Sequence, residues 1–175
     1  MNLSATGTRI GLSMWNVQKQ WKMVTALLDE QSTLSLATTG PDGEACVAPL
    51  FYIVDEGLTL CWLSSENSAH SINLTRTPRA AAAVYRDTAD WKRICGVQMR
   101  GTTSRIEDPV RRHALIAAYC ERFKLGSVLR VAIRRSVLYA FQPEHLRYID
   151  NAKRFGYKFE LRRGAEGWKD TKAKS

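Results

Sequence analysis

Three short apolar runs separated by tight turns constrain the fold of this chain more than any other feature. Leu34–Thr38 alternates larger apolar with small side chains and is followed by Gly40-Pro41-Asp42-Gly43, a strong turn signal. Ala45–Val54 and Leu58–Ser64 come next, with Asp55-Glu56-Gly57 as a second turn between them. Connections this short join antiparallel neighbours. This part of the chain is therefore predicted to be an antiparallel meander.

The strand pattern resumes after a short helix. Ser65–Arg76 breaks the alternation and predicts a helix that ends before Pro78. Further strands are expected at Ala80–Tyr85, Ile94–Thr103, Val137–Gln142, Leu146–Ile149 and Tyr157–Leu161, and further helices at Asn16–Glu30, Asp108–Phe123 and Leu125–Arg135. Many strands with few helices between them favour a closed or partly closed antiparallel barrel. We predict a mainly β protein, an antiparallel barrel of six or more strands with flanking helices.

Helical spacing indicates which faces the two long helices bury. In Asn16–Glu30 the apolar stripe comprises Val17, Trp21, Val24 and Leu28. In Asp108–Phe123 the stripe comprises His113, Ile116, Ala117 and Cys120, so His113 is expected to be in the core or half-buried. The last residues, Arg162–Ser175, are basic and contain Trp168 as their one large apolar residue. We expect this tail to be frayed.

The length and the net charge of the chain limit the number of domains and the kinds of partner that it can have. The 175 residues suit one domain, here taken as 15–161, with residues 1–14 as an N-terminal extension and 162–175 as a basic tail. A formal net charge of +9 favours a polyanion, a phosphorylated ligand or an anionic surface as the partner. The longest uncharged run that resembles a span is Ala45–Val54, far short of the roughly 20 residues of a membrane helix.

Cysteine and motif content excludes several kinds of chemistry. The four cysteines form no C-x-x-C pair, which disfavours zinc-ribbon and thioredoxin-type sites and favours reduced core thiols in a cytoplasmic protein. Residues Met1–Gly11 show no secretory signal pattern. The chain has no nucleophile elbow, zincin helix, P-loop or dinucleotide-binding glycine motif. His70, His113 and His145 are too scattered to predict a metal site.

The stretch from Leu63 to Pro78 carries the clearest chemical signal. A strand ends in hydroxyl residues and gives way to a short helix whose first turn carries Ser68 and His70. Hydroxyls, an imidazole and free backbone N–H groups that meet where a helix begins are suited to hold a phosphate. The alternative is an ordinary serine N-cap with a surface histidine.

The same stretch resembles a known family. Its S-S-x-x-S-x-H-x-x-N-L-x-x-x-P pattern is similar to the T-S-x-x-S-x-K-x-x-N-L-x-x-N-P signature of the pyridoxamine 5′-phosphate oxidase-like, FMN-binding split-barrel proteins. The order of flanking helix and strands agrees over residues 15–161. Histidine in place of lysine, the segment Gly96–Gly101, and the segments Ile149–Asn151 and Phe155–Lys158 resemble the YhbP-type branch.

The resemblance implies a six-stranded antiparallel split β-barrel that forms a homodimer with FMN at the subunit interface. By position, strand residues of Ala48–Tyr52 would flank the flavin ring, and Leu63 with Ser64 would lie beside the ring or its ribityl chain. Ser68 and His70 would contact the phosphate, and Gln98 would lie near the flavin edge. The partner chain would contribute around Asp150, Asn151 and Phe155. The implied cofactor-binding set is Pro49, Leu50, Phe51, Leu63, Ser64, Ser68, His70, Gln98, Asp150, Asn151 and Phe155.

This sequence matches only part of the residue set with which the family binds the phosphate of its substrate. Tyr119, Arg122 and Ser127 could fill part of a Tyr…Arg…Ser set, although Arg122 comes one position early and Phe123 stands at the expected place. The family's C-terminal Arg-x-His pair is replaced by Phe155-Gly156-Tyr157. Oxidation of pyridoxamine phosphate itself is therefore not expected.

Three functions remain open on the sequence. The first is a flavin-dependent oxidoreductase of unknown substrate with a small-molecule redox partner, NADH or NADPH being the candidate. The second is an FMN-binding or sensing module without turnover. The third is a basic nucleic-acid-binding domain, which is weakly supported because Arg130, Arg134, Arg135 and the other basic residues are spread over many segments.

Overall fold

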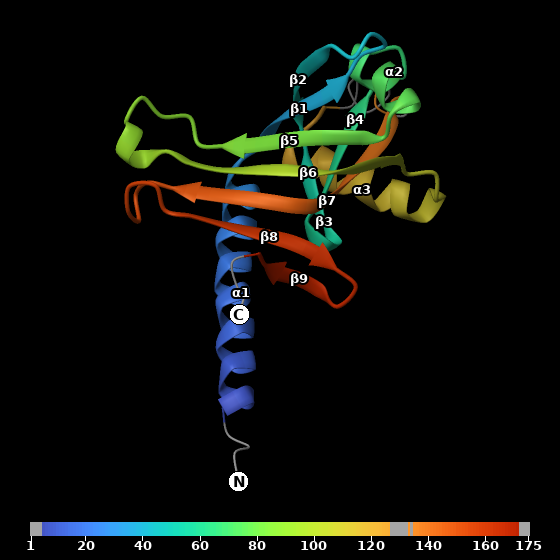
Figure 1. Cartoon of the computed structure of the whole chain (residues 1–175). Helices are drawn as coiled ribbons and strands as arrows, with labels where there is room; N and C mark the ends of the chain where they lie inside the picture. The colour runs from blue at the N-terminus through green and yellow to red at the C-terminus, as the bar shows by residue number, and fades with distance from the viewer. Residues whose placement is uncertain (1–4, 127–132, 134, 172–175) are drawn as a thin grey trace.

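A single antiparallel sheet organises the computed structural model, which describes residues 5–126, 133 and 135–171 (Figure 1). The strand order is β2-β1-β5-β6-β7-β4-β3, with β8 paired to β7 and β9 to β8. The described strands are β1 Thr33–Thr39, β2 Ala45–Phe51, β3 Ile53–Asp55, β4 Thr59–Ser64, β5 Arg79–Tyr85, β6 Cys95–Arg105, β7 Val137–Asp150, β8 Lys158–Gly164 and β9 Gly167–Asp170. The prediction of a mainly β antiparallel fold with flanking helices is confirmed, and over the described residues the whole sheet, with β8 and β9 included, has nine strands.

Strand β7 divides the sheet into two parts. One edge of β7 pairs with β6 from Tyr139 to Asp150. The other edge pairs with β4 over residues 137–141 and with β8 over residues 145–149. The pairing with β4 belongs to the barrel, whereas the pairing with β8 belongs to a β8–β9 extension. The strands β4 and β8 run in different directions from their shared neighbour β7 (Figure 1).

A bulge lets β7 continue through Pro143, where the sequence predicted two separate strands. The register between β6 and β7 shifts at Arg100/Gly101, next to Pro143. Proline is tolerated at such an irregularity because it has no N–H to donate to the ladder. Gly101 is required there, since a Cβ on it would lie 2.0 Å from the carbonyl oxygen of Gln142.

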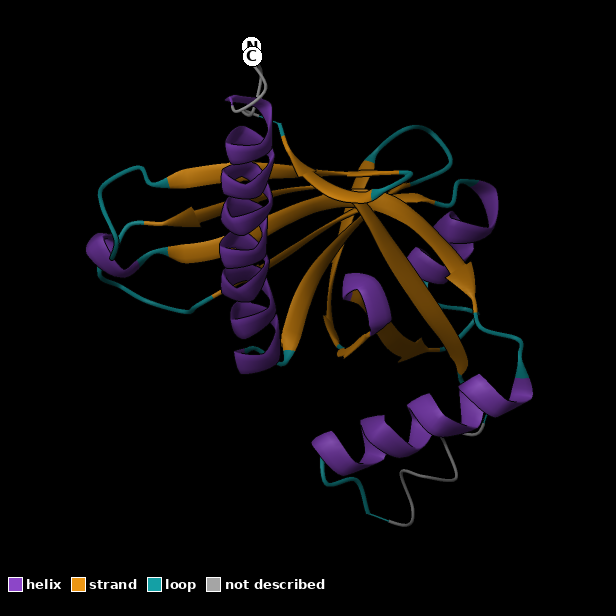
Figure 2. Cartoon of the chain, turned by 90° about the horizontal axis from the view of Figure 1, so that it is seen from below, coloured by secondary structure: helices purple, strands orange, loops and turns teal. Residues whose placement is uncertain are grey.

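Over the part of the chain that the structure describes, the α-helices beside the sheet are α1 Ala5–Glu30, α2 Ala69–Arg76 and α3 Pro109–Arg122, together with the short 3-10 helices η1 Glu56–Leu58 and η2 Trp91–Arg93. Helix α1 crosses one face of the sheet, whereas α3 lies at the far end of the barrel (Figure 2). The predicted stripe of α1 is confirmed, with Val24 and Leu28 fully buried. Helix α1 begins earlier than the predicted Asn16. None of the described helices is long and apolar enough to cross a membrane.

The core has two parts that lie on opposite faces of β4. Leu60 and Trp62 face the main cluster beneath α1, while Cys61 faces a second cluster that includes Leu115 and Tyr119 of α3. The predicted stripe of α3 is confirmed at Cys120, which is buried, but wrong at His113, which is exposed. The buried face of the helix consists of Leu115, Tyr119 and Cys120.

The expectation of a frayed tail was wrong for residues 162–171. Strands β8 and β9 form a hairpin that packs beside α1, and the rings of Trp168 and Trp21 have their centroids 5.9 Å apart. Gln20 Nε2 donates to Asp170 Oδ2 at 2.6 Å. The partly buried Trp168 and a tight turn at Gly167, with a φ of +104°, hold this segment in place despite its charge. The helix predicted over Leu125–Arg135 falls largely outside the described residues.

Candidate functional site

The junction between β4 and α2 gathers Ser64, Ser68 and His70, as the sequence predicted for a phosphate site. Ser64 Oγ and Ser68 Oγ lie 2.7 and 3.0 Å from His70 Nε2, and 3.1 Å from each other. Ser68 also N-caps α2, with its Oγ accepting from the backbone N–H of Ser71. The N-cap alternative is thus realised together with the convergence of hydroxyls and imidazole. We call these three residues the serine–histidine cluster.

Burial sets the charge of the imidazole in this cluster. His70 is half-buried, and this lowers the pKa of His70 below its ordinary value. No carboxylate contacts His70 among the residues that the structure describes. A neutral ring is compatible with both serine contacts, because its Nε2 donates in one tautomer and accepts in the other. An arriving phosphate would offer the ring its first nearby negative charge, so binding would be coupled to proton uptake.

Strand β2 places a free sheet edge beside the cluster. It stands at one end of the strand order and lies next to α2 and β4. Its side chains alternate, so that Pro49 and Phe51 are exposed and Leu50 is half-buried. Phe51 packs on Phe123 with ring centroids 5.0 Å apart. Leu63, from β4, is half-buried against the second core cluster. An unpaired strand edge with apolar side chains can accommodate a flat ring and hydrogen-bond its heteroatoms.

Gln98 lies farther along the outer face of the sheet, opposite to α1. Register aligns it with Ala83, Ser35 and Pro49 on successive strands. This row borders a hollow of about 540 Å³ whose floor is made of small side chains. Gln98 therefore shares a face with Pro49 but does not touch the serine–histidine cluster.

Asp150, Asn151 and Phe155 lie at the other end of β7. Ser64 pairs with Val137 at the first residue of β7, and Cys95 pairs with Asp150 at its last. At about 3.3 Å per residue the two ends are roughly 40 Å apart. One chain therefore does not bring these three residues to the serine–histidine cluster.

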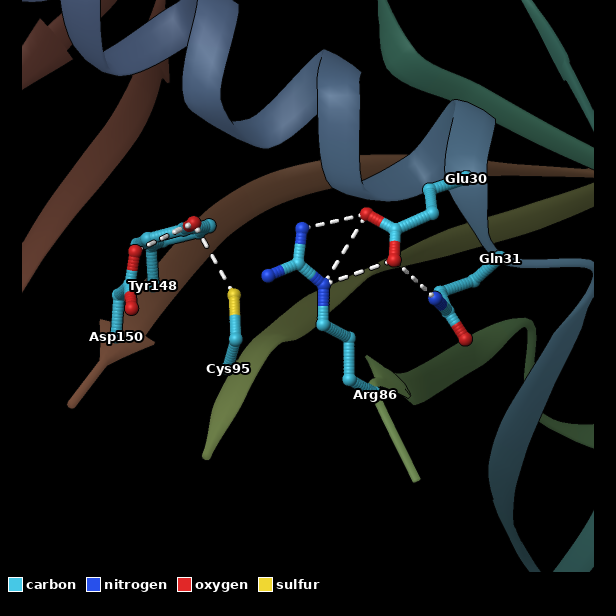
Figure 3. A network of polar contacts seen from close by, with 6 residues as sticks. All are labelled: Glu30, Gln31, Arg86, Cys95, Tyr148 and Asp150. Atoms are coloured by element: carbon cyan, nitrogen blue, oxygen red, sulfur yellow. Dashed lines mark hydrogen bonds and ion pairs between the residues drawn. The ribbon is translucent and has the colours of Figure 1, made fainter. Parts of the chain in front are cut away.

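The Asp150 end contains a polar network that the sequence did not reveal (Figure 3). Tyr148 Oη lies 3.2 Å from Cys95 Sγ and donates to Asp150 Oδ2 at 3.4 Å. Burial raises the pKa of both Cys95 and Tyr148. Beside them the Arg86 guanidinium pairs with Glu30 at 2.5 Å and lowers the pKa of that carboxyl. The alternation of β6 and β7 could have identified Cys95 and Tyr148 as inward-facing, but not their pairing.

The tip beyond this network is built from two hairpins. Asn151 Nδ2 donates to the carbonyl of Trp91, and the ring of Phe155 meets that of Trp91 edge-on at 5.6 Å. Phe155 remains 77% exposed. The tip thus presents aromatic surface away from its own barrel.

Comparison with known proteins gives the chain its family. The sequence profile of the family described as pyridoxamine 5′-phosphate oxidase matches residues 21–150. The chain belongs to the pyridoxamine 5′-phosphate oxidase family. No curated protein matches it. Assignment to the YhbP-type branch stays a prediction.

Solved structures share the fold at low identity. The conserved protein Rv2991 from Mycobacterium tuberculosis is 22% identical with a TM-score of 0.67, covering 74% of this chain and 84% of that one. HutZ, the haem storage protein of Vibrio cholerae, is 21% identical with a TM-score of 0.60, covering 69% and 87%. A pyridoxamine 5′-phosphate oxidase-related, FMN-binding protein from Nostoc punctiforme is 15% identical with a TM-score of 0.63, covering 79% and 85%.

Tyr119 and Arg122, two of the three residues expected in the family's substrate-phosphate set, make contacts within the protein itself. Tyr119 is buried, its Oη donates to the Phe51 carbonyl at 3.5 Å, and burial raises the pKa of Tyr119 to about 12. The Arg122 guanidinium donates to the backbone carbonyls of Asp29 and Gln31 at 2.9 and 2.7 Å. Ser127 lies outside the described residues. Within the described ranges, no group of three acidic, histidine or cysteine side chains is arranged to hold a metal ion.

Proposed function

We propose that this chain is an FMN-binding protein that acts as a flavin-dependent oxidoreductase. The observation that carries the proposal is the serine–histidine cluster, where two hydroxyls and an imidazole meet at the first turn of α2. Family membership supports the same interpretation. Bound FMN supplies hydride or electron transfer, and the protein supplies binding and orientation.

Ser64, Ser68 and His70 would hold the phosphate by hydroxyl donation and by a protonated ring. The free edge of β2 would orient the ring system, with Pro49 and Phe51 covering apolar surface. Reduced thiols suit the cytoplasm, where we place the protein: all four cysteines are free and three are buried.

We further propose a homodimer with the cofactor at the subunit interface. The Asp150 end of one chain lies too far from its own serine–histidine cluster to serve the same cofactor, and a second copy would bring the two ends together. The outer sheet face also exposes apolar side chains that need a cover, with Val47 70%, Phe51 54% and Tyr85 57% exposed. A small-molecule donor, NADH or NADPH, would then reach the flavin at this interface.

The test is FMN titration of the purified protein by flavin fluorescence quenching. The double variant Ser68→Ala/His70→Ala should bind FMN about tenfold or more weakly, because it removes two polar contacts to an anion. His113→Ala is the matched control, since His113 is exposed on α3 and outside the cluster. Equal affinity of both variants would remove the cluster from the cofactor site.

The visible spectrum and its response to reductant separate the other functions. A flavin spectrum that bleaches with NADH or NADPH indicates an oxidoreductase, and one that does not bleach indicates a binding or sensing module. Haem binding, which the name of HutZ describes for that neighbour, would give a Soret band instead. A protein that takes up no FMN but binds nucleic acid with a steep salt dependence would overturn the proposal.

A further inference from the structure

Four basic residues face one another in a single row across the outer face of the sheet. Arg100 of β6 pairs with His145 of β7, His145 pairs with Arg162 of β8, and Arg162 pairs with Lys169 of β9. Figure 1 shows these four strands side by side. Like charges directly opposite on neighbouring strands destabilise a sheet. The pairing of Arg162 with Lys169 therefore destabilises the β8–β9 hairpin, and no attractive contact between the two side chains offsets this repulsion.

The carboxylates near this row pair with His145 and Lys169 but with neither of its two arginines. The carboxylate of Glu160 lies 3.1 Å from His145 Nε2, and that of Glu166 lies 2.8 Å from Lys169 Nζ. Arg100 donates to His145 Nδ1 at 3.4 Å, and the other ring nitrogen, Nε2, faces Glu160. Within residues 5–126 and 135–171, neither Arg100 nor Arg162 contacts a carboxylate.

A hollow lies where these charges meet. It has a volume of about 330 Å³ and is lined by Arg79, Arg100, Glu144, His145, Arg162 and Arg163. Glu144 is held by Arg79 at 2.7 Å and accepts from Thr102 at 3.4 Å, so its charge is already neutralised. Arg100 and Arg162 stand two strands apart, about 10 Å between Cα atoms. Long side chains at that spacing can close on one anion from both sides.

We propose that this basic hollow binds a pyrophosphate group, either as a free anion or as the central part of a dinucleotide. Two adjacent phosphoryl groups match the guanidinium groups of Arg100 and Arg162, which line the hollow from β6 and β8, and Arg163 adds a third cation. A single phosphate would engage one arginine well and the other poorly. The hollow is built from β5, β6, β7 and β8, and shares no lining residue with the serine–histidine cluster.

The experiment is calorimetric titration of the full-length protein with inorganic pyrophosphate, without divalent metal and at fixed ionic strength. Arg100→Gln and Arg162→Gln should each weaken binding about tenfold or more, because each removes a charge-assisted contact. Arg105→Gln is the control: it removes the same charge from an exposed position on the same strand and should change affinity less than about twofold. Inorganic phosphate should bind about tenfold more weakly than pyrophosphate.

Further titrations identify the source of the pyrophosphate group and distinguish the hollow from the serine–histidine cluster. Tighter binding of NAD⁺ than of pyrophosphate would assign the hollow to a dinucleotide, and the reverse order to a free anion; both support the proposal. In a His70→Ala background, Arg162→Gln should weaken pyrophosphate binding by the same factor as in the wild-type protein. Loss of binding in His70→Ala but not in Arg162→Gln would overturn the proposal, as would equal losses in Arg105→Gln. Single-stranded DNA binding tighter than pyrophosphate, and lost in Arg162→Gln, would overturn it in favour of nucleic acid.

Discussion

His70 shows how one side chain changes the chemistry of a family position. Lysine at this point in the family's signature carries a permanent charge, whereas burial lowers the pKa of His70, so that the free ring is neutral near pH 7. Phosphate would raise the pKa of His70 again when it binds. The anion site would therefore be regulated by protonation in a way that a lysine site is not.

This coupling predicts a pH-dependent FMN affinity. Between the lower pKa of the free protein and the higher pKa of the complex, binding takes up a proton, so affinity falls as pH rises. Fluorescence titration from pH 7 to 9, where the FMN phosphate is already a dianion, should show this decline. His70→Lys should bind FMN at least as tightly and give a flat profile below the lysine pKa. A wild-type profile as flat as that of His70→Lys would show that His70 does not act as a charged ligand.

Gly101 is a second position where one residue type is required. A Cβ there would overlap the Gln142 carbonyl at 2.0 Å, and backbone on both sides of the bulge cannot move away freely. Gly101→Ala should lower the free energy of unfolding by about 3 kcal/mol or more, measured by urea denaturation. Gly126→Ala is the control, because open space surrounds Gly126, and it should change stability by less than about 0.5 kcal/mol.

At the scale of elements, the β8–β9 hairpin stabilises α1. Trp168 packs on Trp21, and Gln20 reaches Asp170. Trp168→Ala should cost about 2 kcal/mol in urea unfolding, less than a fully buried tryptophan would, because Trp168 is only partly buried. Trp91→Ala, at the exposed hairpin tip, should cost clearly less. Equal costs would mean that the hairpin contributes nothing to the anchoring of α1.

The sequence predicted elements whose signals are local and missed those set by distant contacts. The turn at Gly40–Gly43 and the stripe of α1 could be read directly. The continuity of β7 through Pro143 could not, because it depends on a bulge formed with Gly101 of another strand. The serine–histidine cluster was predictable since its members lie within seven residues of chain. The role of Arg122, which donates to carbonyls at the end of α1, has no local signature.

At the scale of the molecule, the opposite ends of β7 carry complementary halves of one proposed site. One end holds the serine–histidine cluster, and the other holds Asp150 in a buried network below the exposed ring of Phe155. The outer sheet face between them is apolar at its β2 side and basic at its β8 side. A two-fold axis through this face would cover the apolar part and set each cluster against the partner's Asp150 end, the isologous arrangement of most dimers.

This arrangement predicts that a charge at the apolar part of the face separates the subunits. Val47→Glu would bury an unpaired carboxylate in the interface, so light scattering coupled to gel filtration should show a shift from dimer toward monomer. FMN affinity should fall with it, because each cofactor would lose its contacts from the second chain. Val110→Glu, at a 79% exposed position on α3, introduces the same charge and should leave both properties unchanged. If Val47→Glu remains a dimer with full FMN affinity, a different face joins the subunits. Loss of FMN without dissociation would instead place the side chain of Val47 in the flavin site of an intact dimer.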